Sequence, residues 1–106
     1  MAIRELPVRS DIFAYTFLTT LEQNDYLFTL RFNSRQDRWI MDIQLPDETD
    51  LLIGIPLLVS FPLTFRFRDT RLPPGQFFVI DETGQERNPT RDNLGTDIKL
   101  LYSESA

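Results

Sequence analysis

The chain has 106 residues, of which 42% are hydrophobic and 12% aromatic, and it carries a formal net charge of −5 with neither cysteine nor histidine. This length fits one domain, residues 1–106, and the apolar share is enough to build a core without disulfide or metal staples. The missing residue types exclude disulfides, zinc-thiolate sites and thiol or imidazole catalysis, and the acidic charge disfavours nucleic acid and membrane surfaces, so we expect protein partners and no enzyme activity, metal or cofactor.

The N-terminal part of the chain predicts an arm followed by a strand. Residues 1–9 are expected to form an N-terminal arm or an edge strand, and they lack the basic and apolar regions of a secretory signal, so we expect synthesis in the cytosol. Residues 11–21 are rich in aromatic and β-branched side chains and predict a first long strand. The polar residues 22–25 are expected to form the turn that follows.

Residues 26–45 carry the strongest pattern in the chain. On both sides of the polar tract 33–38, apolar residues alternate with other residues at the period of two that strands require. Antiparallel pairing around this loop predicts four cross-strand pairs, namely Phe32 with Trp39, Leu30 with Met41, Phe28 with Ile43 and Tyr26 with Leu45. All eight side chains then share one face, and a second layer must cover it because a register slip would turn half of them to water.

The middle of the chain predicts two more strands. A proline-led polar loop at residues 46–50 precedes the apolar residues 51–59, which are expected to form a buried strand with a bulge or bend at Gly54 and Pro56. The apolar residues 51–65 are shorter than the roughly 20 residues of a membrane span and are interrupted by glycine and proline. Residues 64–68 alternate phenylalanine with polar residues and predict a strand with an aromatic inner face and a basic outer face.

The C-terminal third predicts a compact series of turns and strands. The turn Leu72-Pro-Pro-Gly75 leads into a strand at residues 76–81. Residues 89–93 are expected to form a short helix or capped turn with Thr90 as the cap and Gly95 as its end. Residues 98–102 predict the final strand, before a frayed tail at 103–106.

The predicted fold is therefore all-β, a single small antiparallel β-sandwich or partly closed barrel of about seven strands. Its core is expected to include the inward aromatic and aliphatic residues of the central hairpin and of the fifth predicted strand, namely Phe28, Leu30, Phe32, Trp39, Met41, Ile43, Phe65 and Phe67. The aromatic members match the period of the other apolar residues and have no arginines or lysines interleaved on their face, which favours a core over a stacking platform.

Four arginines form the candidate partner interface, and they are Arg66, Arg68, Arg71 and Arg91. A basic stripe on an acidic protein can meet an acidic patch on a neighbouring copy or on another partner. The alternative is an exposed strand face with weak local ion pairs, and both interpretations stay open.

The acidic loops favour ordinary loops over cation sites. Asp47, Glu48 and Asp50 could offer oxygen ligands, but the glycine of an EF-hand loop is absent, and residues 92–97 lead to the same interpretation. Nothing marks one carboxylate of a pair as buried and protonated, so the sequence gives no support for catalysis by paired carboxylates.

Four groups of segments stand out when they are taken together. They are Tyr26-Leu-Phe-Thr-Leu-Arg-Phe-Asn with Asp37-Arg-Trp-Ile-Met-Asp42, Leu52-Ile-Gly-Ile-Pro-Leu57, Arg66-Phe-Arg-Asp69 with Leu72-Pro-Pro-Gly75 and Val79-Ile-Asp81, and Pro89-Thr-Arg-Asp-Asn-Leu-Gly95 with Lys99-Leu-Leu-Tyr102. Together these segments resemble the cyanophage-type baseplate plug proteins of contractile-tailed phages. The resemblance spans about residues 26–102 and depends on the order and spacing of these segments, while residues before Asn24 carry little of it.

The resemblance implies a non-enzymatic structural protein of the virion. It implies an all-β plug or hub subunit near the distal end of the tail tube, in contact with hub, spike and tail-tube proteins and assembled as a symmetric homo-oligomer. Such a protein would be made in the host cytoplasm, and the family supplies no catalytic residues to transfer. The alternative function from the residues alone is a soluble β-sandwich module that binds carbohydrate or peptide.

Overall fold

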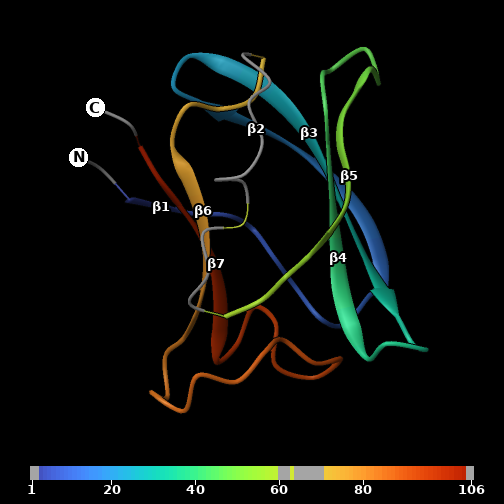
Figure 1. The fold of residues 1–106 in the computed structure, drawn as a ribbon, viewed down its shortest axis with the longest axis vertical. Helices are drawn as coiled ribbons and strands as arrows, with labels where there is room; N and C mark the ends of the chain where they lie inside the picture. Colours follow the sequence, from blue (N-terminus) through green and yellow to red (C-terminus); the bar gives the residue numbers. More distant parts are fainter. Residues whose placement is uncertain (1–2, 60–62, 64–70, 105–106) are drawn as a thin grey trace.

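The computed structural model describes residues 3–59, 63 and 71–104. Within these residues the chain forms seven strands and no helix, and the strands are β1 (Ile3–Glu5), β2 (Ala14–Leu21), β3 (Asn24–Asn33), β4 (Arg38–Gln44), β5 (Asp50–Pro56), β6 (Gln76–Asp81) and β7 (Ile98–Ser103). They build two antiparallel sheets, ordered β2-β3-β4-β5 and β1-β7-β6, which face each other in Figure 1. The predicted small all-β sandwich is confirmed, and the sheets do not close into a barrel.

The central hairpin has the register that its apolar alternation predicts. Three of the four predicted pairs are present in the β3–β4 ladder, namely Phe32 with Trp39, Leu30 with Met41 and Phe28 with Ile43. The fourth pair, Tyr26 with Leu45, is wrong because β4 ends at Gln44. The Leu45 amide instead donates to the Thr49 carbonyl at 2.9 Å and so belongs to the next loop.

The first long strand begins later than predicted, at Ala14, because the chain before it is held in a bend. The Tyr15 hydroxyl accepts a hydrogen bond from the Arg9 amide (2.7 Å) and donates one to the Arg9 carbonyl (2.8 Å). The following turn is also tighter than the predicted residues 22–25. Glu22 and Gln23 both have positive φ, 49° and 75°, as a two-residue type I′ hairpin requires.

The apolar residues 51–59 divide between the two sheets. The predicted irregularity at Gly54 is confirmed by its φ of 81° and by shifts in the β4–β5 register. β5 ends at Pro56, which has no amide hydrogen to continue a ladder. Val59 then forms a parallel bridge with Val79 of β6, so the predicted single strand is wrong beyond Pro56.

The remaining predictions concern the second half of the chain. The predicted strand at 64–68, with Phe65, Arg66, Phe67 and Arg68, lies outside the described residues. The predicted turn at residues 72–75 is confirmed, and the predicted strand that follows it is β6. Residues 89–93 form the capped turn and not a helix, with the Asp92 amide donating to the Thr90 hydroxyl at 3.3 Å. No helix among the described residues is long and apolar enough to cross a membrane.

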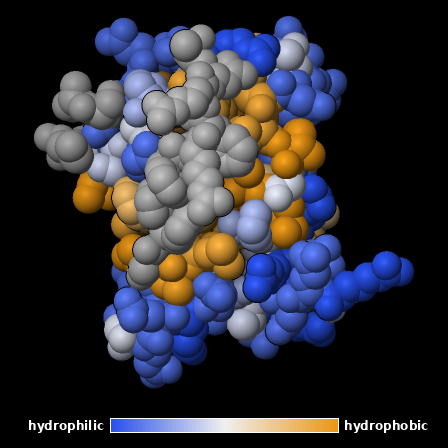
Figure 2. Space-filling model, in the orientation of Figure 1, coloured by the Kyte–Doolittle hydropathy of each residue, from blue (hydrophilic) through white to orange (hydrophobic). Residues whose placement is uncertain are grey.

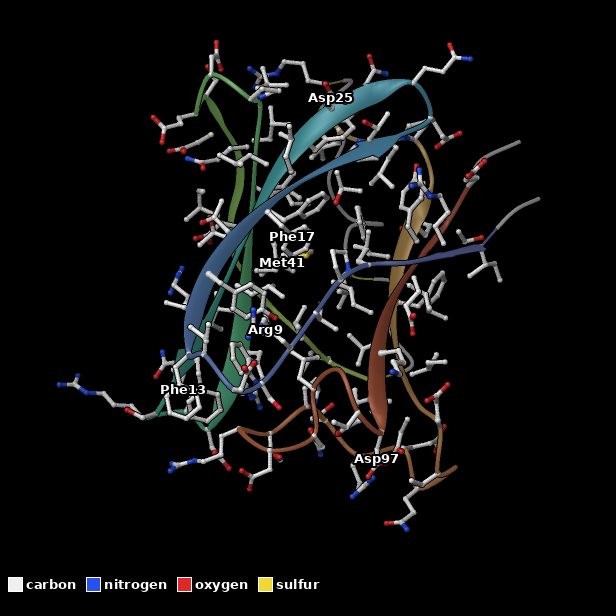
Figure 3. The ribbon with its side chains drawn as sticks, turned by 180° about the vertical axis from the view of Figure 1, so that it is seen from behind. Arg9, Phe13, Phe17, Asp25, Met41 and Asp97 are labelled. Carbon is white, nitrogen blue, oxygen red and sulfur yellow. The ribbon has the colours of Figure 1, made fainter. Side chains whose placement is uncertain are left out.

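The core lies between the two sheets. Its largest fully buried side chains come from both layers, and they include Trp39, Tyr102, Phe28 and Phe77. Phe28 of the larger sheet packs edge-on against Phe77 of the smaller one, with ring centroids 5.7 Å apart. Figure 3 shows Phe17 and Met41 in the space between the sheets. The described part of the predicted core is confirmed, although Phe32 is only partly buried.

A buried tyrosine links the two layers at one end. The Tyr102 hydroxyl of β7 donates to the Glu22 carboxylate in the β2–β3 turn and accepts the Gly75 amide at 2.7 Å. Burial, followed by the bond to Glu22, raises the pKa of the Tyr102 phenol. Gly75 must be glycine because a Cβ there would lie 2.0 Å from the Ser103 carbonyl oxygen.

Candidate partner interface

The acidic loops use their carboxylates within the loops themselves. Asp47 accepts the Thr49 amide at 3.0 Å, and hydrogen bonds from Thr49 lower the pKa of the Asp47 carboxyl. Asp50 accepts the Gln44 side-chain amide at 2.7 Å. Among the residues the structure describes, no three acidic side chains gather as metal ligands would. These contacts fit the predicted ordinary loop.

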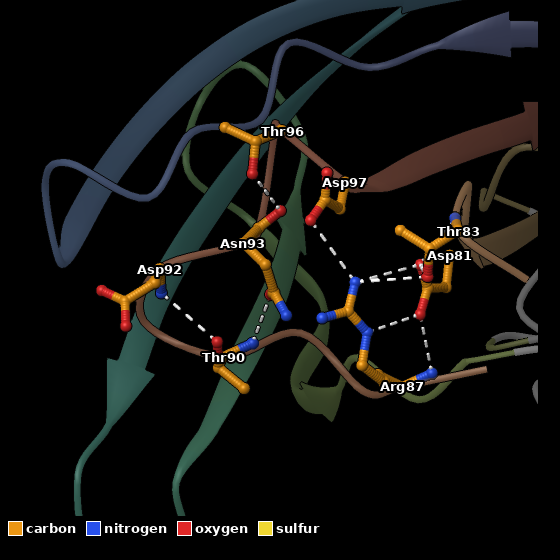
Figure 4. Close-up of polar contacts among 8 residues, drawn as sticks. All are labelled: Asp81, Thr83, Arg87, Thr90, Asp92, Asn93, Thr96 and Asp97. Atoms are coloured by element: carbon orange, nitrogen blue, oxygen red, sulfur yellow. Dashed lines mark hydrogen bonds and ion pairs between the residues drawn. The ribbon is translucent and has the colours of Figure 1, made fainter. Parts of the chain in front are cut away.

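A second acidic group fastens the loop between β6 and β7 (Figure 4). The Asp81 side chain is inaccessible to solvent and accepts the Arg87 guanidinium at 2.8 Å and the Thr83 hydroxyl at 2.6 Å. Arg87 also reaches Asp97 at 3.4 Å. Hydrogen bonds from Arg87 and then Thr83 hold the pKa of the Asp81 carboxyl well below its ordinary value of 3.8. The group is therefore a structural clamp across both ends of the loop.

Asp81→Asn should lower the free energy of unfolding at neutral pH. The free energy of unfolding of the variant should also fall less on acidification than that of the wild type. Because the folded state depresses the Asp81 pKa below 3.8, the unfolded chain takes up this proton first as the pH falls. The stabilisation is complete above about pH 4 and is lost on further acidification.

Urea unfolding at several pH values between about 6 and 2 measures this dependence. The stability difference between the wild type and Asp81→Asn should narrow towards the acid end. Asp92→Asn removes the same charge from an exposed position in the same loop and serves as the control. A difference for Asp81→Asn that stays constant with pH would contradict the assignment.

Arg71 is exposed beside a surface hollow of about 650 Å³ at one end of the sandwich. The hollow is lined by residues from the start of β3, from the β4–β5 loop and from the turn before β6, namely Asn24, Asp25, Tyr26, Leu45, Pro46, Arg71, Leu72 and Pro74. The Asp25 carboxylate, the Arg71 guanidinium and apolar rings thus line one hollow. These groups could bind a polar segment of another protein.

Arg91 belongs to a cluster of aromatic rings at the opposite end. Its guanidinium carbon lies 5.5 Å from the centroid of the Phe32 ring. Phe13, which is 52% exposed, packs against Phe32 with ring centroids 5.7 Å apart and meets the edge of Trp39 at 6.4 Å. Figure 3 shows Phe13 at the far end of the molecule from Asp25. Arginine and aromatic side chains of this kind are enriched at protein interfaces.

The structure does not bring Arg71 and Arg91 into one patch. Tyr26 beside Arg71 and Phe32 beneath Arg91 lie six positions apart in β3, which is about 20 Å along a strand. Arg66 and Arg68 lie outside the described residues. Any partner that contacts both described arginines must therefore span the length of the sandwich.

A third surface, on the outer face of the smaller sheet, was not among the sequence predictions. A hollow of about 370 Å³ is lined there by Ile3, Phe78, Ile80, Leu101 and Ser103, and Ile3 is 65% exposed. The signal was present in β6, where Phe77 and Val79 face the core while Phe78 and Ile80 are apolar on the other face. Figure 2 displays another side of the molecule, where both sheets are seen edge-on, and there apolar residues cross the middle while polar residues gather at both ends.

The described part of the chain is a small β-sandwich that exposes apolar surfaces and surfaces with arginine. Such surfaces are typical of a subunit in a larger assembly. A family model described as cyanophage baseplate Pam3 plug gp18 matches residues 3–105, nearly the whole chain. The chain belongs to this family of cyanophage baseplate plug proteins. Comparison with curated proteins gives no significant match.

Membership of this family gives the chain a structural role in the baseplate of a phage virion. The earlier resemblance covered residues 26–102, whereas the family match begins at residue 3 and includes β1 and β2. The N-terminal strands are therefore part of the family's common sequence pattern.

Proposed function

We propose that this protein is a non-enzymatic plug or hub subunit near the distal end of the tail tube. It is a single domain without a cofactor, made in the host cytoplasm, and it contacts hub, spike and tail-tube proteins as a symmetric homo-oligomer. The observation that carries this proposal is the family match over residues 3–105. The exposed cluster of Phe13, Phe32 and Arg91 supports it because such a group is suited to burial by a partner.

The direct test locates the subunit in the particle. Cryo-electron microscopy of virions should show density for this sandwich at the distal end of the tube, and co-expression with hub, spike and tube proteins should recover a complex. Density elsewhere in the baseplate would contradict the proposed position. Binding to an oligosaccharide array by a protein absent from the baseplate would favour the alternative of a carbohydrate module.

Arg91→Gln should spare the fold and weaken incorporation into the baseplate. Loss of the exposed cation–π contact with Phe32 removes about 0.5 to 1 kcal/mol of folding stability. Replacing an arginine that is buried with aromatic rings in an interface commonly weakens binding by more than about 1 kcal/mol, which is roughly fivefold in affinity. Subunit occupancy in purified particles measures the effect.

The matched control is Arg35→Gln, the same change of charge at an exposed position in the β3–β4 loop, which lies at the same end but outside the cluster of Phe13, Phe32 and Arg91. It should leave occupancy near that of the wild type. If Arg91→Gln particles are fully occupied and Arg91 is solvated in the unmodified particle, this end of the sandwich is not the interface. Arg71→Gln then tests the opposite end in the same way.

A further inference from the structure

The sheet edges of the sandwich are protected unequally. Among the described residues, β1 has three residues, β5 is broken by the bulge at Gly54, and β6 has Val59 bridged beside it and its Phe77 carbonyl bonded to the Leu63 amide at 3.0 Å. β2 is instead eight residues long, regular in register and free of charge and proline. Proteins normally blunt such an edge because it invites another strand.

The register shows which backbone groups of β2 face outward. The Phe32 amide donates to the Phe13 carbonyl at 2.8 Å, so odd-numbered residues of β2 exchange hydrogen bonds with β3. The even-numbered residues direct their amides and carbonyls away from the sheet. Among the described residues, the only bond on this side of β2 is that of Arg4 to the outward carbonyl of Thr20, which leaves Ala14, Thr16 and Leu18 as the open edge. In Figure 3, β2 crosses in front of the other strands of its sheet.

This open edge complements itself when two copies run antiparallel. With Thr16 opposite Thr16 of a second copy, Ala14 falls opposite Leu18, and all three residues can bond across the junction. The small alanine leaves room for Leu18, which is 58% exposed. On the inner face Tyr15 falls opposite Phe17, and these two aromatic residues are only partly buried although they face the core.

The ends of the pairing are set by an arginine. In this register Ile12 of one copy lies opposite Thr20 of the other, where the Arg4 guanidinium sits. The neighbouring Asp11 carboxylate pairs with Arg9 of its own chain at 2.6 Å. Arg4 therefore ends the strand pairing at Thr20 and limits the junction to residues 14–18.

We propose that β2 is a self-association edge, at which a second copy of this chain adds antiparallel about a two-fold axis through Thr16. The two four-stranded sheets then join into one continuous sheet. The proposal rests on the homo-oligomer stated under the proposed function. It is tested on the purified protein, so that its failure can be told apart from a wrong position in the virion.

A charge exchange at Thr16 tests both the edge and its register. Thr16→Lys and Thr16→Glu each put like charges opposite one another on the axis and should weaken the dimer about fivefold or more, whereas an equimolar mixture should dimerise again. Sedimentation over about 1 µM to 1 mM measures this. Thr29→Lys is the matched control. It removes the same 3.0 Å contact between the Thr16 and Thr29 hydroxyls, but its charge lies on β3, one strand away from the edge.

Hydrogen exchange of the wild-type protein gives a second measurement that needs no variant. The amides of Ala14, Thr16 and Leu18 should become protected as the concentration rises, while those of Tyr15 and Phe17 are protected throughout. A wild-type protein that stays monomeric at about 1 mM, or a mixture of the two Thr16 variants that fails to restore a dimer, overturns the proposal. Protection of the same amides by a hub or tube protein alone would also overturn it, in favour of a heterologous strand.

Discussion

Trp39→Ala is expected to destabilise the protein by about 3 to 5 kcal/mol, much of the stability of a small domain. Trp39 is fully buried and is surrounded by rings from β2, from β3 and from the segment before β2, namely Tyr15, Phe32 and Phe13. Its indole N–H donates to the Thr90 carbonyl at 2.7 Å and so ties β4 to the loop before β7. Truncation leaves a large cavity and one carbonyl without its partner. Chemical denaturation measures the loss.

Trp39→Phe separates the two contributions. It keeps most of the ring packing but removes the donor to Thr90, so we expect a cost of about 1 to 3 kcal/mol. Ile53→Ala, at a side chain 51% exposed on β5, is the control for a large-to-small change outside the core. A denaturation midpoint that Trp39→Ala leaves unchanged would contradict the assigned core.

Among the glycine-to-alanine changes other than the one at Gly75, Gly95→Ala is expected to be the most destabilising. Gly95 has φ of 90°, and a Cβ there would lie 2.5 Å from the Val8 carbonyl oxygen. The left-handed backbone costs about 1 to 2 kcal/mol for a non-glycine residue. Separating the N-terminal segment from this turn adds about 1 to 3 kcal/mol, the usual cost of overpacking.

Gly84→Ala is the matched control because Gly84 has nearly the same φ, 81°, but a Cβ would meet nothing within 4 Å. It should therefore show the backbone cost alone, about 1 to 2 kcal/mol. The difference between the two free energies of unfolding measures the close approach of residues 8 and 95. Equal losses would mean that Val8 moves away without penalty.

The sequence predicted those parts of the fold that depend on local pattern. Eight apolar residues around a polar loop specify the β3–β4 register, and three of the four predicted pairs are present. The start of β2 could not be read in the same way because it depends on the Tyr15 hydroxyl binding the backbone of Arg9. The transfer of the chain from β5 towards β6 likewise depends on a contact between Val59 and Val79.

The candidate interface was less predictable because it depends on which segments meet in space. Nothing in the sequence placed Arg71 and Arg91 at opposite ends of the sandwich, since that follows from the packing of their loops against β3. The exposed Phe13 was included in a predicted strand, but it precedes β2, which begins at Ala14. The identity of an edge strand depends on the order of strands in the finished sheet, which no single segment encodes.

The pairing of β1 with β7 has a consequence for the order of folding. Ile3 lies opposite Ser103, so the smaller sheet cannot be completed until the last strand has been synthesised. The larger sheet consists of β2 to β5, each paired with its neighbour in the chain, and such local contacts form early. We therefore expect the nascent chain to hold a four-stranded sheet whose apolar face is not fully covered until residues 98–103 leave the ribosome, a stage at which the chain is prone to aggregation.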